Sequence, residues 1–201
     1  MSHFLVIGYP RTGTTSVVDM LLKEHGHYNN FVQDLKYNGV EKWFAAEKSV
    51  AKMHTHREFK MYGPHLQKII DRTDKVYYTK LRKDLAAHLI SYLCIYLCRL
   101  DDQADPVWQL NFKVEFPITN QVAKEQMYRL ADAMIGLKPK LETYKCLPWK
   151  DSQTIDVFSG ECSVHVNSWS KYLTTEYFKD PDKVKEYSIE YARMLSDEGI
   201  N

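Results

Sequence analysis

The sequence predicts an α/β fold in which a parallel β-sheet is flanked by helices. Near the N-terminus, an apolar run over residues 4–7 passes through a glycine-bearing turn into residues 16–22, whose apolar side chains share one helical face. A second run rich in β-formers, residues 75–80, also leads directly into a helical pattern. Strands that alternate with helices are typical of parallel sheets, whose ligands bind at the carboxyl ends of the strands.

Composition and charge favour one ordinary globular domain covering residues 1–201. A chain of this length can bury roughly 70% of its unfolded surface in one domain. Its 27 basic and 26 acidic residues nearly balance, so no nucleic-acid or membrane-surface partner is expected. The longest apolar stretch, residues 85–97, is too short to span a bilayer. No basic-then-apolar signal follows Met1, so we expect a cytoplasmic protein with four reduced cysteines.

The remaining elements of the first half follow in chain order. We expect a short strand at residues 31–32 and a helix over residues 40–51, where apolar residues recur on one face. Pro64 fits the first turn of another short helix. The strand at residues 75–80 is expected to lead into a helix over residues 83–100.

The second half of the chain is predicted to be mostly helical. Residues 101–118 contain two prolines and suit a loop, although alternating apolar residues there could form a short strand or a lid: Phe112, Val114 and Phe116. Thr119 is a good cap for a helix that Gly136 is expected to end. A last helix is expected to start near Asp180 and to end at Gly199.

Residues 8–15 are the most informative segment of the chain. Gly8 and Gly13 have the spacing of a phosphate-binding P-loop, in which backbone N–H groups and a helix N-terminus converge on an anion. The lysine that ATP- or GTP-cleaving loops place after the second glycine is replaced by Thr14. A cation lies inside the loop instead, at Arg11. The segment predicts a phosphate site without the lysine of a kinase.

This segment resembles the 5′-phosphosulfate-binding loop of the sulfotransferases that use 3′-phosphoadenosine 5′-phosphosulfate (PAPS). The family pattern is roughly Pro-Lys/Arg-Ser/Gly-Gly-Thr-Thr, and the arginine form is most similar to tyrosylprotein and bacterial sulfotransferases. The resemblance implies a P-loop-containing three-layer α/β/α fold. It also implies sulfuryl transfer from PAPS to a hydroxyl or amine of a small-molecule or peptide acceptor, with no metal required. The implied donor contacts are Pro10, Arg11, Thr12, Gly13, Thr14 and Thr15.

A second segment resembles the family's site for the 3′-phosphate. In the family an arginine stands eight residues before a serine, with a Lys-Asp pair between them. Residues 80–88 keep the Lys-Asp pair, and they place Lys80 at the arginine position and His88 at the serine position. A shifted register offers Arg82 or Lys83 with Ser91, and both registers stay open. Either one clusters cations at a strand-to-helix corner, where phosphate is favoured.

A third segment, residues 163–173, is similar to the late loop that folds over adenosine 3′,5′-bisphosphate in relatives. That loop usually carries a lysine or arginine, and His165 is the nearest substitute. The three segments follow the order of the family along the chain. This order supports the resemblance more than any one motif does.

Sulfuryl transfer also needs a cation at the transferring group and a base for the acceptor proton. Arg11 is the candidate cation, because its planar fork can meet the transferring group. The resemblance offers two bases: Asp34, where the tyrosylprotein branch has a glutamate, and His54, where the cytosolic branch has a histidine after Lys-Thr. His56 is a near neighbour, and the choice between Asp34 and His54 stays open.

Two other functions fit the same loop. A P-loop nucleotide or small-molecule kinase would bind magnesium and ATP, and the absent loop lysine counts against it. A non-catalytic nucleotide- or anion-binding module would keep the fold without turnover, and the imperfect 3′-phosphate pair favours it.

Overall fold

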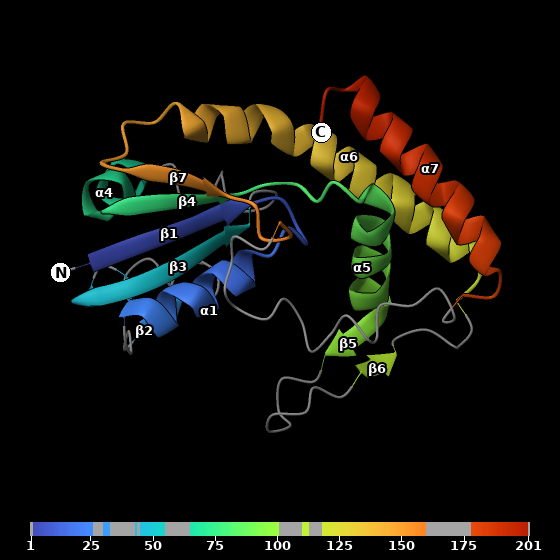
Figure 1. The fold of residues 1–201 in the computed structure, drawn as a ribbon, viewed down its shortest axis with the longest axis horizontal. Helices are drawn as coiled ribbons and strands as arrows, with labels where there is room; N and C mark the ends of the chain where they lie inside the picture. Colours follow the sequence, from blue (N-terminus) through green and yellow to red (C-terminus); the bar gives the residue numbers. More distant parts are fainter. Residues whose placement is uncertain are drawn as a thin grey trace. The chain divides into compact units, whose positions relative to one another are not determined.

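In the computed structural model the chain forms two compact units, each described here by itself (Figure 1). The first unit contains Met1–Arg82 and Gly136–Val166, and the second contains Lys83–Ile135 and Asn167–Asn201. The prediction that residues 1–201 form a single domain stays a prediction. The structure describes residues 2–25, 30–32, 43, 45–54, 65–100, 110–112, 118–159 and 178–200.

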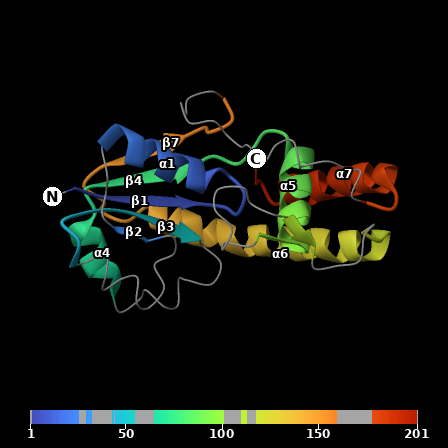
Figure 2. The same ribbon diagram turned by 90° about the horizontal axis from the view of Figure 1, so that it is seen from below.

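The first unit is built on a five-stranded sheet in which every pairing is parallel. This confirms the predicted α/β class with a parallel sheet. Figure 2 shows the strands side by side in the order β2-β3-β1-β4-β7. Their bounds are Asn30–Val32 for β2, Lys48–His54 for β3, Ser2–Gly8 for β1, Lys75–Thr79 for β4 and Ser152–Ile155 for β7.

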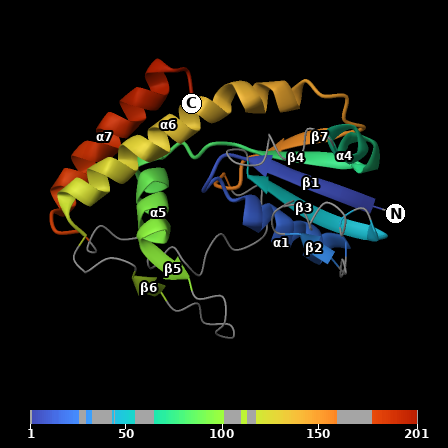
Figure 3. The ribbon, with the colours of Figure 1, turned by 180° about the vertical axis from the view of Figure 1, so that it is seen from behind.

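Helices cover both faces of this sheet (Figures 1 and 3). Side chains alternate across β1, so Phe4 and Val6 pack with α1, Thr14–His25, while Leu5 and Ile7 face the opposite side. On that side the core includes residues of α4, Leu66–Arg72, and of the last turns of α6, Asn120–Lys145. Burial on both faces explains why β1 is a continuous apolar run.

The strand order reverses next to β1. The chain leaves β1 through α1 toward β2 and β3 on one side, whereas β4 pairs with the other side of β1. At such a reversal, the loops that follow neighbouring strands separate, and a crevice opens outside the carboxyl ends of the strands. The loop that follows β1, residues 9–13, lies at this reversal.

The helix predicted over residues 40–51 is wrong for its second half, which is the strand β3. This strand is buried on both faces, so it shows no alternation of polar and apolar residues. Ser49 and Lys52 are themselves buried, at 0% and 5% exposure, and they interrupt the apolar run that would have marked a central strand. Trp43 lies in the core, as the apolar pattern suggested.

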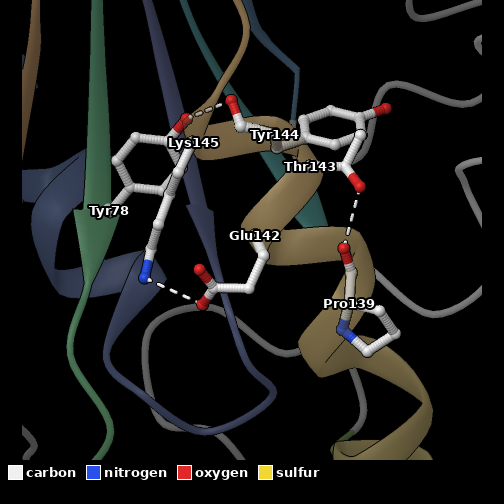
Figure 4. Close-up of polar contacts among 6 residues, drawn as sticks. All are labelled: Tyr78, Pro139, Glu142, Thr143, Tyr144 and Lys145. Carbon is white, nitrogen blue, oxygen red and sulfur yellow. Dashed lines mark hydrogen bonds and ion pairs between the residues drawn. The ribbon is translucent and has the colours of Figure 1, made fainter.

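The helix predicted to end at Gly136 continues as α6 to Lys145. Pro139 lies inside it, and its carbonyl accepts a hydrogen bond of 2.9 Å from the Thr143 hydroxyl (Figure 4). One turn further on, the Tyr78 hydroxyl donates to the Tyr144 carbonyl at 2.9 Å. Packing of these last turns against the sheet outweighs the local cost of a glycine, about 1 kcal/mol, and of the proline.

The second unit contains α5, Leu85–Leu97, the first part of α6, and α7, Pro181–Asp197. The helix predicted over residues 83–100 is shorter than expected, because Cys98–Leu100 forms β5, which pairs antiparallel with β6, Leu110–Phe112. The predicted last helix is confirmed. The Asp180 carboxylate caps it by accepting hydrogen bonds from the backbone N–H groups of residues 182 and 183.

We expect a buried histidine to make the stability of the first unit depend on pH. His3 is 2% exposed and its Nδ1 lies 2.7 Å from the Ser49 hydroxyl, while Nε2 has no hydrogen-bond partner within the described residues. Burial lowers the pKa of His3, as do the nearby positive charges of Arg72, Lys150 and the N-terminus, and Asp74 opposes them. The folded state therefore disfavours protonation, and stability is lost as the pH falls below about 6.5.

We expect the free energy of unfolding, measured in urea, to fall less between pH 7 and pH 5 for His3→Gln than for the wild type. His25→Gln, at an exposed position on α1, is the control for replacing a histidine as such. Equal slopes for all three proteins would remove His3 as the cause.

Candidate functional site

The loop between β1 and α1 has an unusual backbone. Arg11 has φ 63° and Gly13 has φ 83°. Glycine adopts such angles freely, but an arginine there costs about 1 kcal/mol or more and persists only when its surroundings enforce it. Left-handed residues in a turn also aim successive backbone N–H groups to one side, which is the conformation of anion-binding nests.

Two hydroxyls fix this loop to the neighbouring strand. The Thr12 side chain is fully buried, and its Oγ1 donates a hydrogen bond of 2.7 Å to the Tyr9 carbonyl. The same Oγ1 lies 2.6 Å from Oγ1 of Thr79, the last residue of β4. The predicted donor contact of Thr12 would therefore come from its backbone N–H, because its hydroxyl is already engaged within the protein.

The start of α1 provides a positive electrostatic potential that favours a bound anion. The backbone N–H of Val17 donates to the Gly13 carbonyl at 3.1 Å, so the helix begins at the end of the loop. The first N–H groups of a helix lack intrahelical acceptors and carry a partial positive charge. A β-carbon added at Gly13 would lie 2.7 Å from the Val157 side chain. This close approach, together with its positive φ, explains the glycine.

Lys52 is a site residue that the sequence reasoning missed. It extends from β3 to the first turn of α1, where its Nζ donates to Oγ1 of Thr15 at 3.2 Å. The lysine is 5% exposed, and Asp19 on the next turn of α1 interacts with it electrostatically. The cation of a largely buried lysine residue therefore lies near the positive end of a helix. The sequence feature that could have indicated this role is a lysine within a strand. Lys52 stands two residues before His54, the candidate base.

Tyr9 contributes no negative charge to the loop. Its side chain is half-buried against the core on the α4 face of the sheet. Burial, together with the negative charge of Glu142, raises the pKa of Tyr9 to about 12. The phenol is therefore neutral at physiological pH and does not repel an anion.

Cations also follow β4 at the same edge of the sheet. Lys80 is exposed, and its backbone N–H donates to the Ile155 carbonyl at 3.0 Å. The Arg82 guanidinium lies 4.0 Å from the centre of the Phe158 ring, close enough for a cation–π contact. Phe158 is positioned by its backbone N–H, which donates to the Asp156 carboxylate at 3.2 Å. These contacts hold Arg82 beside the end of β7.

The residues of the predicted 3′-phosphate site belong to different units. Lys80 and Arg82 belong to the first unit, whereas His88 and Ser91 lie on α5 in the second. Both α5 residues are buried, and His88 Nδ1 lies 2.8 Å from the Tyr191 hydroxyl of α7, with the two rings stacked. This position gives His88 a role in packing α5 against α7, and its contact with a phosphate stays a prediction.

The remaining predicted residues lie largely outside the described part of the chain. Asp34, His56 and His165 are not among the described residues. His54 is the last residue of β3, where its backbone pairs in register with Gly8. Its side chain is not described.

The fold defines an α/β protein whose candidate ligand site lies at the carboxyl edge of a parallel sheet. Comparison with family models, curated proteins and solved structures finds no match to this chain. Among the described residues, no group of His, Cys, Asp or Glu is placed to hold a metal ion. No helix in the described ranges is both long enough and apolar enough to cross a membrane. The geometry of the loop and its sequence pattern therefore carry the functional argument.

Proposed function

We propose that this protein transfers a sulfuryl group from PAPS to a hydroxyl or amine acceptor. The observation that carries the proposal is the loop between β1 and α1, where the left-handed Arg11 and Gly13 lead directly into the start of a helix. The first backbone N–H groups of α1 carry a partial positive charge that favours an anion there. Lys52 adds a second cation near this helix start, since its Nζ lies 3.2 Å from Oγ1 of Thr15.

The loop sequence favours sulfuryl transfer over phosphoryl transfer. Thr14 stands where a kinase loop carries its lysine, and Arg11 inside the loop matches the resemblance to sulfotransferases. In the proposed reaction the acceptor oxygen or nitrogen bonds to sulfur, and the bond between sulfur and the bridging phosphate oxygen breaks. Arg11 and Lys52 are proposed to stabilise the negative charge that develops on that oxygen. The leaving product is adenosine 3′,5′-bisphosphate.

The acceptor proton needs a base, for which Asp34 and His54 are the candidates. The pairing of Gly8 with His54 supports the histidine, because it brings the backbone of residue 54 to the start of the loop. For the 3′-phosphate of the donor, we propose Lys80 and Arg82, which follow β4 at the same edge of the sheet.

We expect adenosine 3′,5′-bisphosphate to raise the melting temperature by mass action, and to do so without a divalent metal. Thermal unfolding is measured with this bisphosphate, with adenosine 5′-monophosphate, and with ATP plus magnesium. Lys52→Met should lose the shift. Lys48→Met, at an exposed position on the same strand, should keep it.

Each outcome assigns a function. Stabilisation by ATP plus magnesium, but not by the bisphosphate, would identify a kinase. Stabilisation by the bisphosphate without sulfuryl transfer from labelled PAPS to any acceptor in a metabolite extract would identify a binding module. No stabilisation by any of these nucleotides would refute the proposal.

A further inference from the structure

We propose that Thr79 is a positioning residue that holds the loop of residues 9–13 in its anion-binding conformation. The proposal rests on the proposed function of this loop and assigns a role to a residue on another strand. Thr79 is the last residue of β4 and is 7% exposed. Its hydroxyl contacts the loop at the Thr12 hydroxyl.

The direction of the hydrogen bonds follows from counting hydroxyl protons. A threonine hydroxyl has one proton to donate and can accept as well. Thr12 donates its proton to the Tyr9 carbonyl at 2.7 Å, so the short contact of 2.6 Å between Thr12 and Thr79 uses the Thr79 proton. A chain of two hydrogen bonds therefore runs from Thr79 through Thr12 to the Tyr9 carbonyl.

The two hydrogen bonds involve residues on both sides of Arg11, the strained residue of the loop. Tyr9 and Thr12 stand on either side of Arg11, whose φ of 63° needs support from its surroundings. The hydrogen bond from Thr12 to Tyr9 lies within the turn, whereas the hydrogen bond from Thr79 to Thr12 connects the turn to β4 of the sheet. Without the Thr79 hydroxyl, Thr12 loses a partner in a buried position, and the turn loses its anchor to β4.

Gly8 shows how closely the anchor fits. A β-carbon at Gly8 would lie 1.9 Å from Oγ1 of Thr79 and 2.8 Å from Oγ1 of Thr12. The two hydroxyls therefore occupy the space in which a side chain of residue 8 would lie. The absence of a side chain at residue 8 is what lets the end of β4 touch the turn.

The test compares Thr79→Val, which keeps the shape but removes the hydroxyl, with Thr79→Ser, which keeps the hydroxyl. Thr73→Val is the matched control, because Thr73 is fully buried and its hydroxyl donates to the Ile69 carbonyl at 2.7 Å, at the opposite end of β4. Two quantities are measured for each protein. They are the amide hydrogen exchange of residues 9–15 without ligand and the Kd for adenosine 3′,5′-bisphosphate.

We expect Thr79→Val to speed exchange in this segment and to weaken bisphosphate binding, each by about tenfold. Thr79→Ser and Thr73→Val should leave both quantities near their wild-type values. If Thr79→Val does not fold, Thr79→Ala takes its place in the same comparison.

The outcomes separate this proposal from the proposed function. Wild-type exchange and wild-type affinity in Thr79→Val would refute the role of Thr79 and leave the function intact. If the wild type does not bind the bisphosphate, the proposed function fails, and the exchange rates alone decide whether Thr79 holds the loop. Equal effects of Thr79→Val and Thr73→Val would show a general loss of stability and would also refute the role.

Discussion

Replacing Arg11 by alanine should lower sulfuryl turnover by about a hundredfold or more, equivalent to about 3 kcal/mol of transition-state stabilisation. The guanidinium is proposed to meet charge that develops only as the sulfur–oxygen bond breaks. Affinity for adenosine 3′,5′-bisphosphate should fall much less, because backbone N–H groups and Lys52 are proposed to supply other contacts to the phosphate. Turnover is measured at saturating PAPS, and product affinity by calorimetry.

Two controls separate charge from backbone strain at this position. Arg11→Lys keeps the charge but loses the planar fork, so it should recover part of the turnover. Arg11→Gly removes both the side chain and the cost of φ 63°, so it should be more stable than Arg11→Ala while remaining inactive. Wild-type turnover in Arg11→Ala would remove this residue from the mechanism.

Gly8→Ala should cost about 3 kcal/mol of unfolding free energy, because its β-carbon would lie 1.9 Å from Oγ1 of Thr79 in a packed strand. The displaced hydroxyl pair should also release the loop and weaken nucleotide binding. Urea unfolding and the bisphosphate Kd measure the two effects. Gly136→Ala is the control, because among the described residues no atom beyond the adjoining helix backbone lies within 4 Å of the added carbon, and it should stabilise by up to about 1 kcal/mol. Unchanged stability in Gly8→Ala would show that the strand end adjusts without cost.

The elements predicted correctly are those whose own sequence contains the signal. The strand β1 is a bare apolar run, α1 has apolar residues on one face, and Asp180-Pro181 marks the start of α7. The strand β7 escaped prediction because three of its four residues are exposed, so no hydrophobic pattern marks it. The extension of α6 past Gly136 depends on packing against the sheet, which local helix propensity cannot reveal.

The same distinction between local and long-range information applies to the candidate site. The loop and Arg11 could be predicted from the glycine spacing, because the contacts that define a turn are local in sequence. Lys52 and Thr79 were not predicted as site residues, because only the parallel pairing of β1 with β3 and β4 brings them to the loop. The phosphate contact of His88, inferred from spacing along the chain, stays a prediction, and the contact of its ring with Tyr191 could not be inferred from spacing.

The contact between Thr12 and Thr79 also bears on how the protein folds. The two residues are 67 positions apart in sequence, and the strands that bring them together pair in parallel, which requires long-range closure of the chain. The turn at residues 9–13 is synthesised before β4, yet its anchor does not exist until β4 has been made and has paired with β1. Competence to bind an anion therefore arises with the assembled sheet, and a nascent chain that ends before residue 79 carries the loop sequence without its fixed geometry.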